Sequence, residues 1–233
     1  SLFSIMSLIP PMVQNLRGYP VLITGLVLMP RGIGTMISML IVGKLANKVD
    51  ARFNMAAGLA IMALSMYFMA GFDTGIDTWA ITWTGFVQGI GMGQVMVPLM
   101  TLTFSTLAPH FRTEGTGVYN LIRNVGGSIG ISIAFTLLSR NTQINHAELG
   151  THITPYNQAI QLSAATAQMN LSNPHDLAMM NGLVTRQATM ISFNDDFKLM
   201  MITCLLAIPL VFLMQQPKYG KPAEGEKLHA VME

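Results

Sequence analysis

Long apolar stretches, separated by short polar ones, dominate this chain. A helix needs about 20 mostly apolar residues to cross a bilayer. The pattern predicts one short apolar helix, four long ones and a shorter last one, over residues 1–13, 20–43, 54–71, 79–107, 115–138 and 198–214. We therefore expect an all-α fold, a polytopic membrane helix bundle of about six spanning helices.

Composition supports this interpretation. Of the 233 residues, 51% are hydrophobic and only 10% are charged, whereas soluble domains carry about 25% charged residues. The mean hydropathy is +0.48. Too little charge remains to cover the surface of a soluble protein of this size.

Basic residues predict the orientation in the membrane. Seven lie in the connections on one side if every predicted helix spans, namely Lys44, Lys48, Arg52, Arg112, Lys218, Lys221 and Lys227. The short turns on the other side carry only Arg17. Because basic residues near helix ends mark the cytoplasm, we expect transmembrane helices over 1–138, a long periplasmic loop over 139–197, a last transmembrane helix over 198–214 and a cytoplasmic tail over 215–233.

The 139–197 stretch is polar, and its segment Pro155–Met169 has the composition of an amphipathic surface helix. Its three histidines, His146, His152 and His175, have no metal-ligand spacing. We predict no metal site.

Small residues recur at four-residue spacing in two of the predicted helices. Gly85, Gly89 and Gly93 share one face of the first helix, and Gly126 and Gly130 repeat the pattern in the second. Such faces let helix backbones approach closely in lipid. Helix packing is the main interpretation, and sliding of these helices during a transport cycle is the alternative. A nucleotide-binding loop would need a preceding strand, and none is predicted here.

Arg31 lies near the middle of its predicted helix. Placing an arginine there costs roughly 2.5–3.5 kcal/mol on insertion scales, so it normally faces a cavity or a partner. One interpretation is a contact with an anionic substrate group or with an acid on another helix. The other is snorkelling or a structural ion pair.

Asn120, Arg123 and Asn124 follow one another at helical spacing and predict a polar stripe on 115–138. Gln88 gives a weaker polar position on 79–107. Cavity lining and pure helix packing both remain open for these residues, which with Arg31 form our set of substrate-cavity candidates.

The sequence shows no Asp or Glu well inside any predicted span, although proton-coupled transport usually needs one. Glu114 and Asp50 lie at span boundaries, where they fit helix caps or ion pairs. We therefore expect the proton-binding residue to lie outside this chain. No catalytic triad, phosphate-binding loop or metal cluster is present, so we predict neither an enzyme nor a cofactor other than the proton gradient.

The turn GKLANKVDARF resembles the cytoplasmic helix-linking motif of the major facilitator superfamily, commonly Gly-x-Leu-Ala-Asp-Arg-x-Gly-Arg. The residues that follow it are Gly43, Leu45, Ala46, Lys48 and Arg52, with Lys48 in place of an Arg. Asn47 replaces the usual Asp, and Asp50 stands where the family has Gly. A similar Asn-Lys-x-Asp-x-Arg version occurs in the fourteen-spanner drug–proton antiporters of the EmrB/QacA type.

Three further segments are similar to that branch: IPPMVQNLRGYPVLITGLVLMPRGIG, RTEGTGVYNLIRNVGGSIGISI and FNDDFKLM. The resemblance covers nearly the whole chain and implies the C-terminal half of a two-bundle transporter. Ser1 stands first instead of Met, so we expect the N-terminal half to precede this chain.

The resemblance implies a proton-coupled multidrug efflux transporter of the bacterial inner membrane that works by alternating access. In it, Gly43, Lys48, Asp50 and Arg52 would form the conformational cytoplasmic motif. The implied partners are a hydrophobic or amphipathic small molecule, membrane lipid, the N-terminal half, a periplasmic adaptor protein and an outer-membrane channel, with no nucleic acid. The alternatives are an exporter of another small solute and a non-transporting truncated membrane protein.

Overall fold

The computed structural model describes residues 2–45, 49–105, 109–153 and 173–213. The described part consists of helices and their connections, with no strand. The helices are α1 (Leu2–Arg17), α2 (Val21–Leu45), α3 (Ala51–Met69), α4 (Thr78–Ser105), a short 3₁₀ helix (Pro109–Phe111), α5 (Arg112–Thr151) and α7 (Pro174–Leu213). The predicted all-α fold is confirmed.

Five of these helices, α2, α3, α4, α5 and α7, are long and apolar enough to cross a membrane. Helix α1 has 16 residues and is shorter than a span. The structure is thus that of a multi-pass membrane helix bundle.

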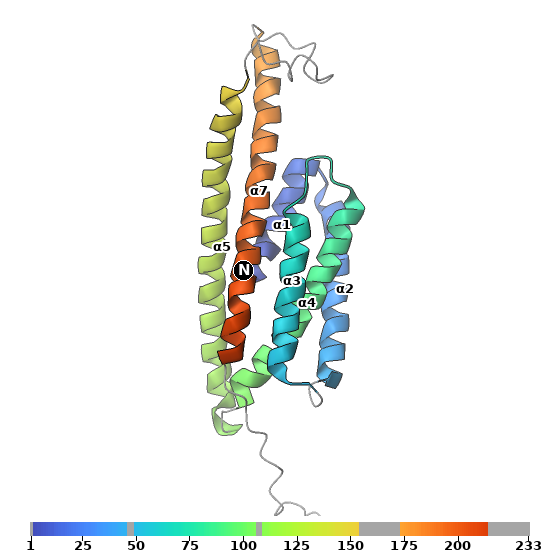
Figure 1. Cartoon of the computed structure of the whole chain (residues 1–233), viewed down its shortest axis with the longest axis vertical. Coiled ribbons are helices and arrows are strands. Elements are labelled where there is room, and N and C mark those ends of the chain that lie inside the picture. The colour runs from blue at the N-terminus through green and yellow to red at the C-terminus, as the bar shows by residue number, and fades with distance from the viewer. Residues whose placement is uncertain (1, 46–48, 106–108, 154–172, 214–233) are drawn as a thin grey trace, which may run out of the picture.

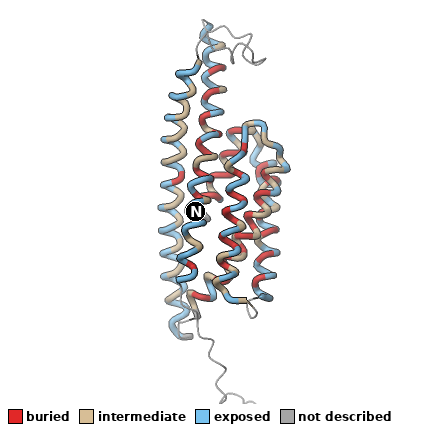
Figure 2. Tube along the Cα trace, in the orientation of Figure 1, coloured by how far each residue is buried: buried red, intermediate tan, exposed pale blue. Residues whose placement is uncertain are grey.

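The helices form a chain of neighbours: α2 packs on α4, α4 on α3, α3 on α7, and α7 on α5 (Figure 1). Helix α1 lies against α5 and α7 and touches α2. The helices differ in burial. Helices α3, α4 and α7 show repeated buried positions, whereas α5 is exposed or half-buried along nearly all its length (Figure 2).

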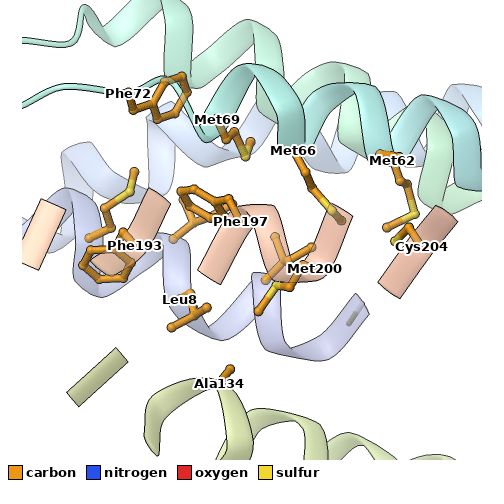
Figure 3. Packing of buried hydrophobic residues seen from close by; sticks show 14 of the residues in the cluster. Leu8, Met62, Met66, Met69, Phe72, Ala134, Phe193, Phe197, Met200 and Cys204 are labelled. Atoms are coloured by element: carbon orange, nitrogen blue, oxygen red, sulfur yellow. The ribbon is translucent and has the colours of Figure 1, made fainter. Parts of the chain in front are cut away.

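The core is built from long, flexible side chains. Methionines of α3 meet phenylalanines of α7, with Leu8 of α1 beneath them (Figure 3). Met66, Phe193 and Phe197 are each at most 2% exposed. Methionine fills irregular gaps between helices because its unbranched chain adapts to its neighbours.

The prediction of a loop over 139–197 is wrong for most of the stretch that the structure describes. Helix α5 continues to Thr151 and α7 already begins at Pro174, while the predicted helix Pro155–Met169 lies outside the described residues. Each helix has 40 residues, about 60 Å at 1.5 Å per residue, or roughly twice the hydrocarbon thickness. Hydropathy marks where lipid contact ends and not where the helix ends.

Contacts between the two helical extensions explain why they stay helical. The Nδ2 of Asn145 on α5 donates to Oγ of Ser192 on α7 at 3.1 Å, and Nε2 of His146 lies 2.9 Å from Oδ1 of Asn181. In Figure 1 the two extensions run side by side beyond the end of the other helices.

Helix α7 is also tied to the turn between α3 and α4. Arg186 and Gln187 donate to the carbonyl and the hydroxyl of Thr74, at 3.3 and 3.1 Å. Asn194 donates to the carbonyl of Phe72 at 2.8 Å. These bonds fix the height of α7 relative to α3.

Candidate functional site

Glycines of α4 bring its backbone against α2. A Cβ added at Gly89 would collide with the carbonyl oxygen of Arg31, and one at Gly93 would lie 2.7 Å from Cβ of Ser38. Gly85 is looser, since its added Cβ would lie 3.9 Å from Cβ of Arg31. This contact places the α2 backbone at Arg31 directly beside α4.

A second close contact, between α3 and α4, was not predicted from the sequence. A Cβ added at Gly58 of α3 would lie 2.8 Å from the carbonyl oxygen of Gly91, and one at Gly91 would lie 2.7 Å from that of Gly58. Gly91 stands two residues after Gly89, on nearly the opposite face of α4. The signal was present in GIGMG, but the single-face interpretation left Gly91 out.

Arg31 and Gln88 are polar side chains buried at this packed centre. Arg31 is 8% exposed and Gln88 is fully buried. Nε and Nη2 of Arg31 and both amide atoms of Gln88 have no hydrogen-bond partner in the described structure. Because a buried polar group without a partner costs roughly 1–3 kcal/mol, the burial of these four atoms is costly in this arrangement.

The charge at this site is positive. Within the described residues the ion pairs are His175–Asp176 and Lys198–Asp195, and Arg31 is in neither. A guanidinium presents planar donors that match a carboxylate or phosphate, and such bonds are strong where water is excluded. Anion binding at Arg31 stays a prediction from its chemistry.

The candidates on α5 lie apart from this centre. Asn120 and Asn124 are exposed, and Arg123 is half-buried with its guanidinium carbon 5.0 Å from the ring centre of Phe3 on α1. The structure thus brings Arg123 to α1, whereas Arg31 lies on α2 beside Gly85 and Gly89 of α4 and Gln88 is buried on α4.

The predicted packing glycines of α5 differ from those of α4. Nothing lies within 4 Å of a Cβ added at Gly126, and Gly130 is half-buried. A Cβ added at the neighbouring Gly127 would lie 3.1 Å from the ring of Phe3.

A hollow of about 490 Å³ also runs along α5, lined among the described residues by Ser132, Phe135, Thr136, Ser139, Arg140 and Gln143. None of the cavity candidates lines it.

The predicted cytoplasmic motif is partly described. Lys48 lies outside the described residues. Asp50 occupies the N-cap position of α3 without a side-chain cap bond, Gly43 has open space around it, and Nε of Arg52 is buried without a partner.

Sequence reasoning missed one buried acid. Asp196 is 1% exposed, and its Oδ2 has no hydrogen-bond partner in the described structure. It lies near the middle of α7, a 40-residue helix that contains a candidate membrane span. The predicted helix start at residue 198 excluded Asp196, because the polar FNDDF segment was assigned to a loop.

Comparisons with known proteins agree with the helical architecture. The profile of the Major Facilitator Superfamily matches residues 1–131. The chain is 29% identical to the fatty acid resistance protein FarB of Neisseria gonorrhoeae, covering 91% of this chain and 42% of FarB. It is 28% identical to the multidrug export protein EmrB of Escherichia coli K12, over 97% of this chain and 44% of EmrB.

A third relative is the lincomycin resistance protein LmrB of Listeria monocytogenes, 26% identical over 70% of this chain and 34% of LmrB. The chain spans less than half the length of these curated relatives. The printed names of these three relatives describe an export protein and resistance proteins.

Proposed function

This chain belongs to the major facilitator superfamily, and from that premise we propose that it forms the C-terminal half of a proton-coupled efflux transporter. The whole protein exports hydrophobic or amphipathic small molecules from the bacterial cytoplasm by alternating access. It lies in the inner membrane, and the N-terminal half completes the substrate cavity.

Two buried polar side chains, Arg31 and Gln88, carry this proposal. A cation and an amide that are buried without partners among the described residues are costly to stability. The cost is offset if a ligand or another part of the protein supplies acceptors during the cycle. The close contact at Gly89 holds the α2 backbone next to α4, so the position of Arg31 is well defined.

The chemistry of the pair favours substrates with an anionic group and an apolar body. The name of the FarB relative refers to fatty acids, which combine a carboxylate with an apolar tail, and that of EmrB refers to multiple drugs. We extend both to this chain: Arg31 and Gln88 bind the anionic group, and apolar side chains contact the remainder. Asn120, Arg123 and Asn124 contribute from α5 at a later stage of the cycle.

The proposed partners follow from the orientation. The paired extensions of α5 and α7 lie at the end of the bundle opposite the basic 44–53 turn, which we place in the periplasm. They are positioned to meet a periplasmic adaptor protein linked to an outer-membrane channel.

Efflux of dyes and of a labelled fatty acid tests the proposal, in cells that lack their own pumps and express the whole encoded protein. We expect export that a protonophore stops. Arg31→Ala should abolish the export of the fatty acid and reduce that of neutral dyes less, while Arg31→Lys should retain part of it because the charge remains but the planar fork does not.

Arg112→Ala is the matched control, since Arg112 is an exposed arginine at the start of α5. Normal export by an inserted Arg31→Ala protein would remove the proposed role of this residue. Export of a sugar or amino acid in place of the dyes would favour a transporter for another solute. No export at all, with the protein in the membrane, would favour a non-transporting protein.

A further inference from the structure

Two neighbouring acids on α7 have opposite surroundings. Asp195 is exposed, and its Oδ1 accepts a bond from Nζ of Lys198 at 3.1 Å. Asp196 is 1% exposed and has an unpartnered Oδ2. One residue of helical rotation thus separates a solvated carboxylate from a buried one.

The face of α7 that carries Asp196 is buried over several turns. Ser192, one turn before it, is fully buried, and Met200, one turn after it, is 2% exposed. Figure 3 shows Met200 together with Phe193 and Phe197 of α7 against Leu8 of α1 and methionines of α3. The surroundings are therefore largely apolar, and a carboxylate there would be poorly solvated.

In the part of the chain that the structure describes, Asp196 has no ion-pair partner. The charged and titratable groups on the helices packed against α7 are Arg17 of α1, Arg52 and Tyr67 of α3, and Arg112, Glu114, Tyr119, Arg123, Arg140, His146 and Glu148 of α5. Those on α7 itself are His175, Asp176, Arg186, Asp195, Lys198 and Cys204. Among the described residues, none of them forms an ion pair with Asp196.

Three of these groups have other contacts or are exposed. The guanidinium of Arg17 lies over the ring of Tyr19, 5.7 Å from its centre. His146 is paired with Asn181, and Arg140 is exposed. Burial without a cation, next to a second acid, favours the protonated form of Asp196 in this arrangement.

The position of Asp196 along α7 is close to one end of the helix bundle. Asn194, two residues earlier, donates to the carbonyl of Phe72 in the turn between α3 and α4. Asp196 is about 3 Å further along the helix. It therefore lies just inside the bundle, near the end that we place at the periplasmic side.

We propose that Asp196 is a proton-binding residue of the transport cycle, at the junction of α7 with α1, α3 and α5. It holds a proton while α7 is packed as in this structure. Opening of that junction admits water, and the carboxyl then releases its proton as Asp196 becomes a solvated carboxylate. This inference rests on the proposed function and places a proton site within this chain, where none was expected.

A chemical test reads the protonated state directly. Dicyclohexylcarbodiimide, an apolar reagent that adds to protonated carboxyl groups, is applied to the whole purified protein in detergent, and the modified peptide is identified by mass spectrometry. We expect modification at Asp196 and not at Asp195. It should disappear in Asp196→Asn, persist in Asp195→Asn and decline as the pH is raised. A protein that stays unmodified at Asp196 at neutral and acid pH would overturn the proposal.

A transport test separates this inference from the proposed function. Vesicles containing the whole protein are given a pH gradient, and efflux is compared with the exchange of labelled against unlabelled substrate. Asp196→Asn should lose the stimulation by the gradient and keep exchange, because the amide is a neutral, isosteric group that cannot release a proton. Asp195→Asn should behave as the wild type does.

Asp196→Glu should recover part of the gradient response, which guards against a variant that simply misfolds. Gradient-driven transport in the wild type with the same response in Asp196→Asn would overturn the inference alone. A wild type that transports nothing would overturn the proposed function and this inference together.

Discussion

Helices α4 and α5 carry similar small-residue patterns in opposite surroundings. Half of the most apolar window of α4 is buried, against 6% of that of α5. The glycines at 89, 91 and 93 of α4 are in backbone contact with α2 or α3, whereas Gly126 of α5 has open space around it. A glycine repeat therefore shows that a helix is able to pack closely, but not which helix it meets.

The difference has a physical origin in the order of the helices. Helix α4 lies between α2 and α3, so two of its faces need close approach. Helix α5 is at the edge of the chain of neighbours, with contacts to α7 and α1 on one side. We attribute its remaining small and polar surface to the proposed N-terminal half and the substrate path.

The largest effect is expected from matched glycine substitutions. Gly89→Ala adds a Cβ against the Arg31 carbonyl, where backbone and not a flexible side chain must move, so it should lower the free energy of unfolding by about 3 kcal/mol. Gly126→Ala meets nothing and should leave that free energy unchanged or raise it by up to about 1 kcal/mol. Thermal unfolding of the purified protein in detergent measures both.

Equal losses in the two variants would show that α5 is as closely packed as α4 in the whole protein. Loss in neither would show that α2 and α4 separate more easily than the contact at Gly89 indicates.

The sequence predicted about six spanning helices, and five of the described helices are long and apolar enough to span. It succeeded because a membrane imposes a length and an apolar composition on each span. It failed at the ends of α5 and α7. There, polar residues hydrogen-bond across the two helices, as Asn145 does to Ser192. That pairing depends on positions 47 residues apart, which hydropathy does not report.

The candidate site was predictable in part for the same reason. Arg31 stood out because an arginine in mid-span is costly. The partner contacts at Gly58 and Gly91 and the burial of Asp196 depend on which helices meet, and local patterns do not contain that information. The separation of Arg123 from Arg31 likewise follows from helix order.

A smaller effect is expected where α5 does have a partner. Asn145→Ala removes the donor to the buried hydroxyl of Ser192 and should lower the free energy of unfolding by about 1 kcal/mol. Asn120→Ala is the control on the same helix, since Asn120 is exposed and its loss should change stability by less than about 0.5 kcal/mol. Unfolding in detergent is compared for both. A larger loss for Asn120→Ala would locate the more stable contacts of α5 near its other end.

The smallest effect concerns the contact of α5 with α1. The guanidinium of Arg123 lies over the ring of Phe3, and the ring also covers Gly127. A cation over an aromatic face at a partly exposed site contributes about 0.5–1 kcal/mol. In a double-mutant cycle with Phe3→Leu and Arg123→Gln, we expect a coupling energy of this size in the free energy of unfolding, because each change alone removes the same interaction. Zero coupling would mean that Arg123 turns away from α1 in the whole protein, toward the substrate path.

Efflux by Arg123→Gln then decides between the two roles of Arg123. Export close to that of the wild type fits a packing contact, and loss of export with unchanged stability fits a residue that binds substrate.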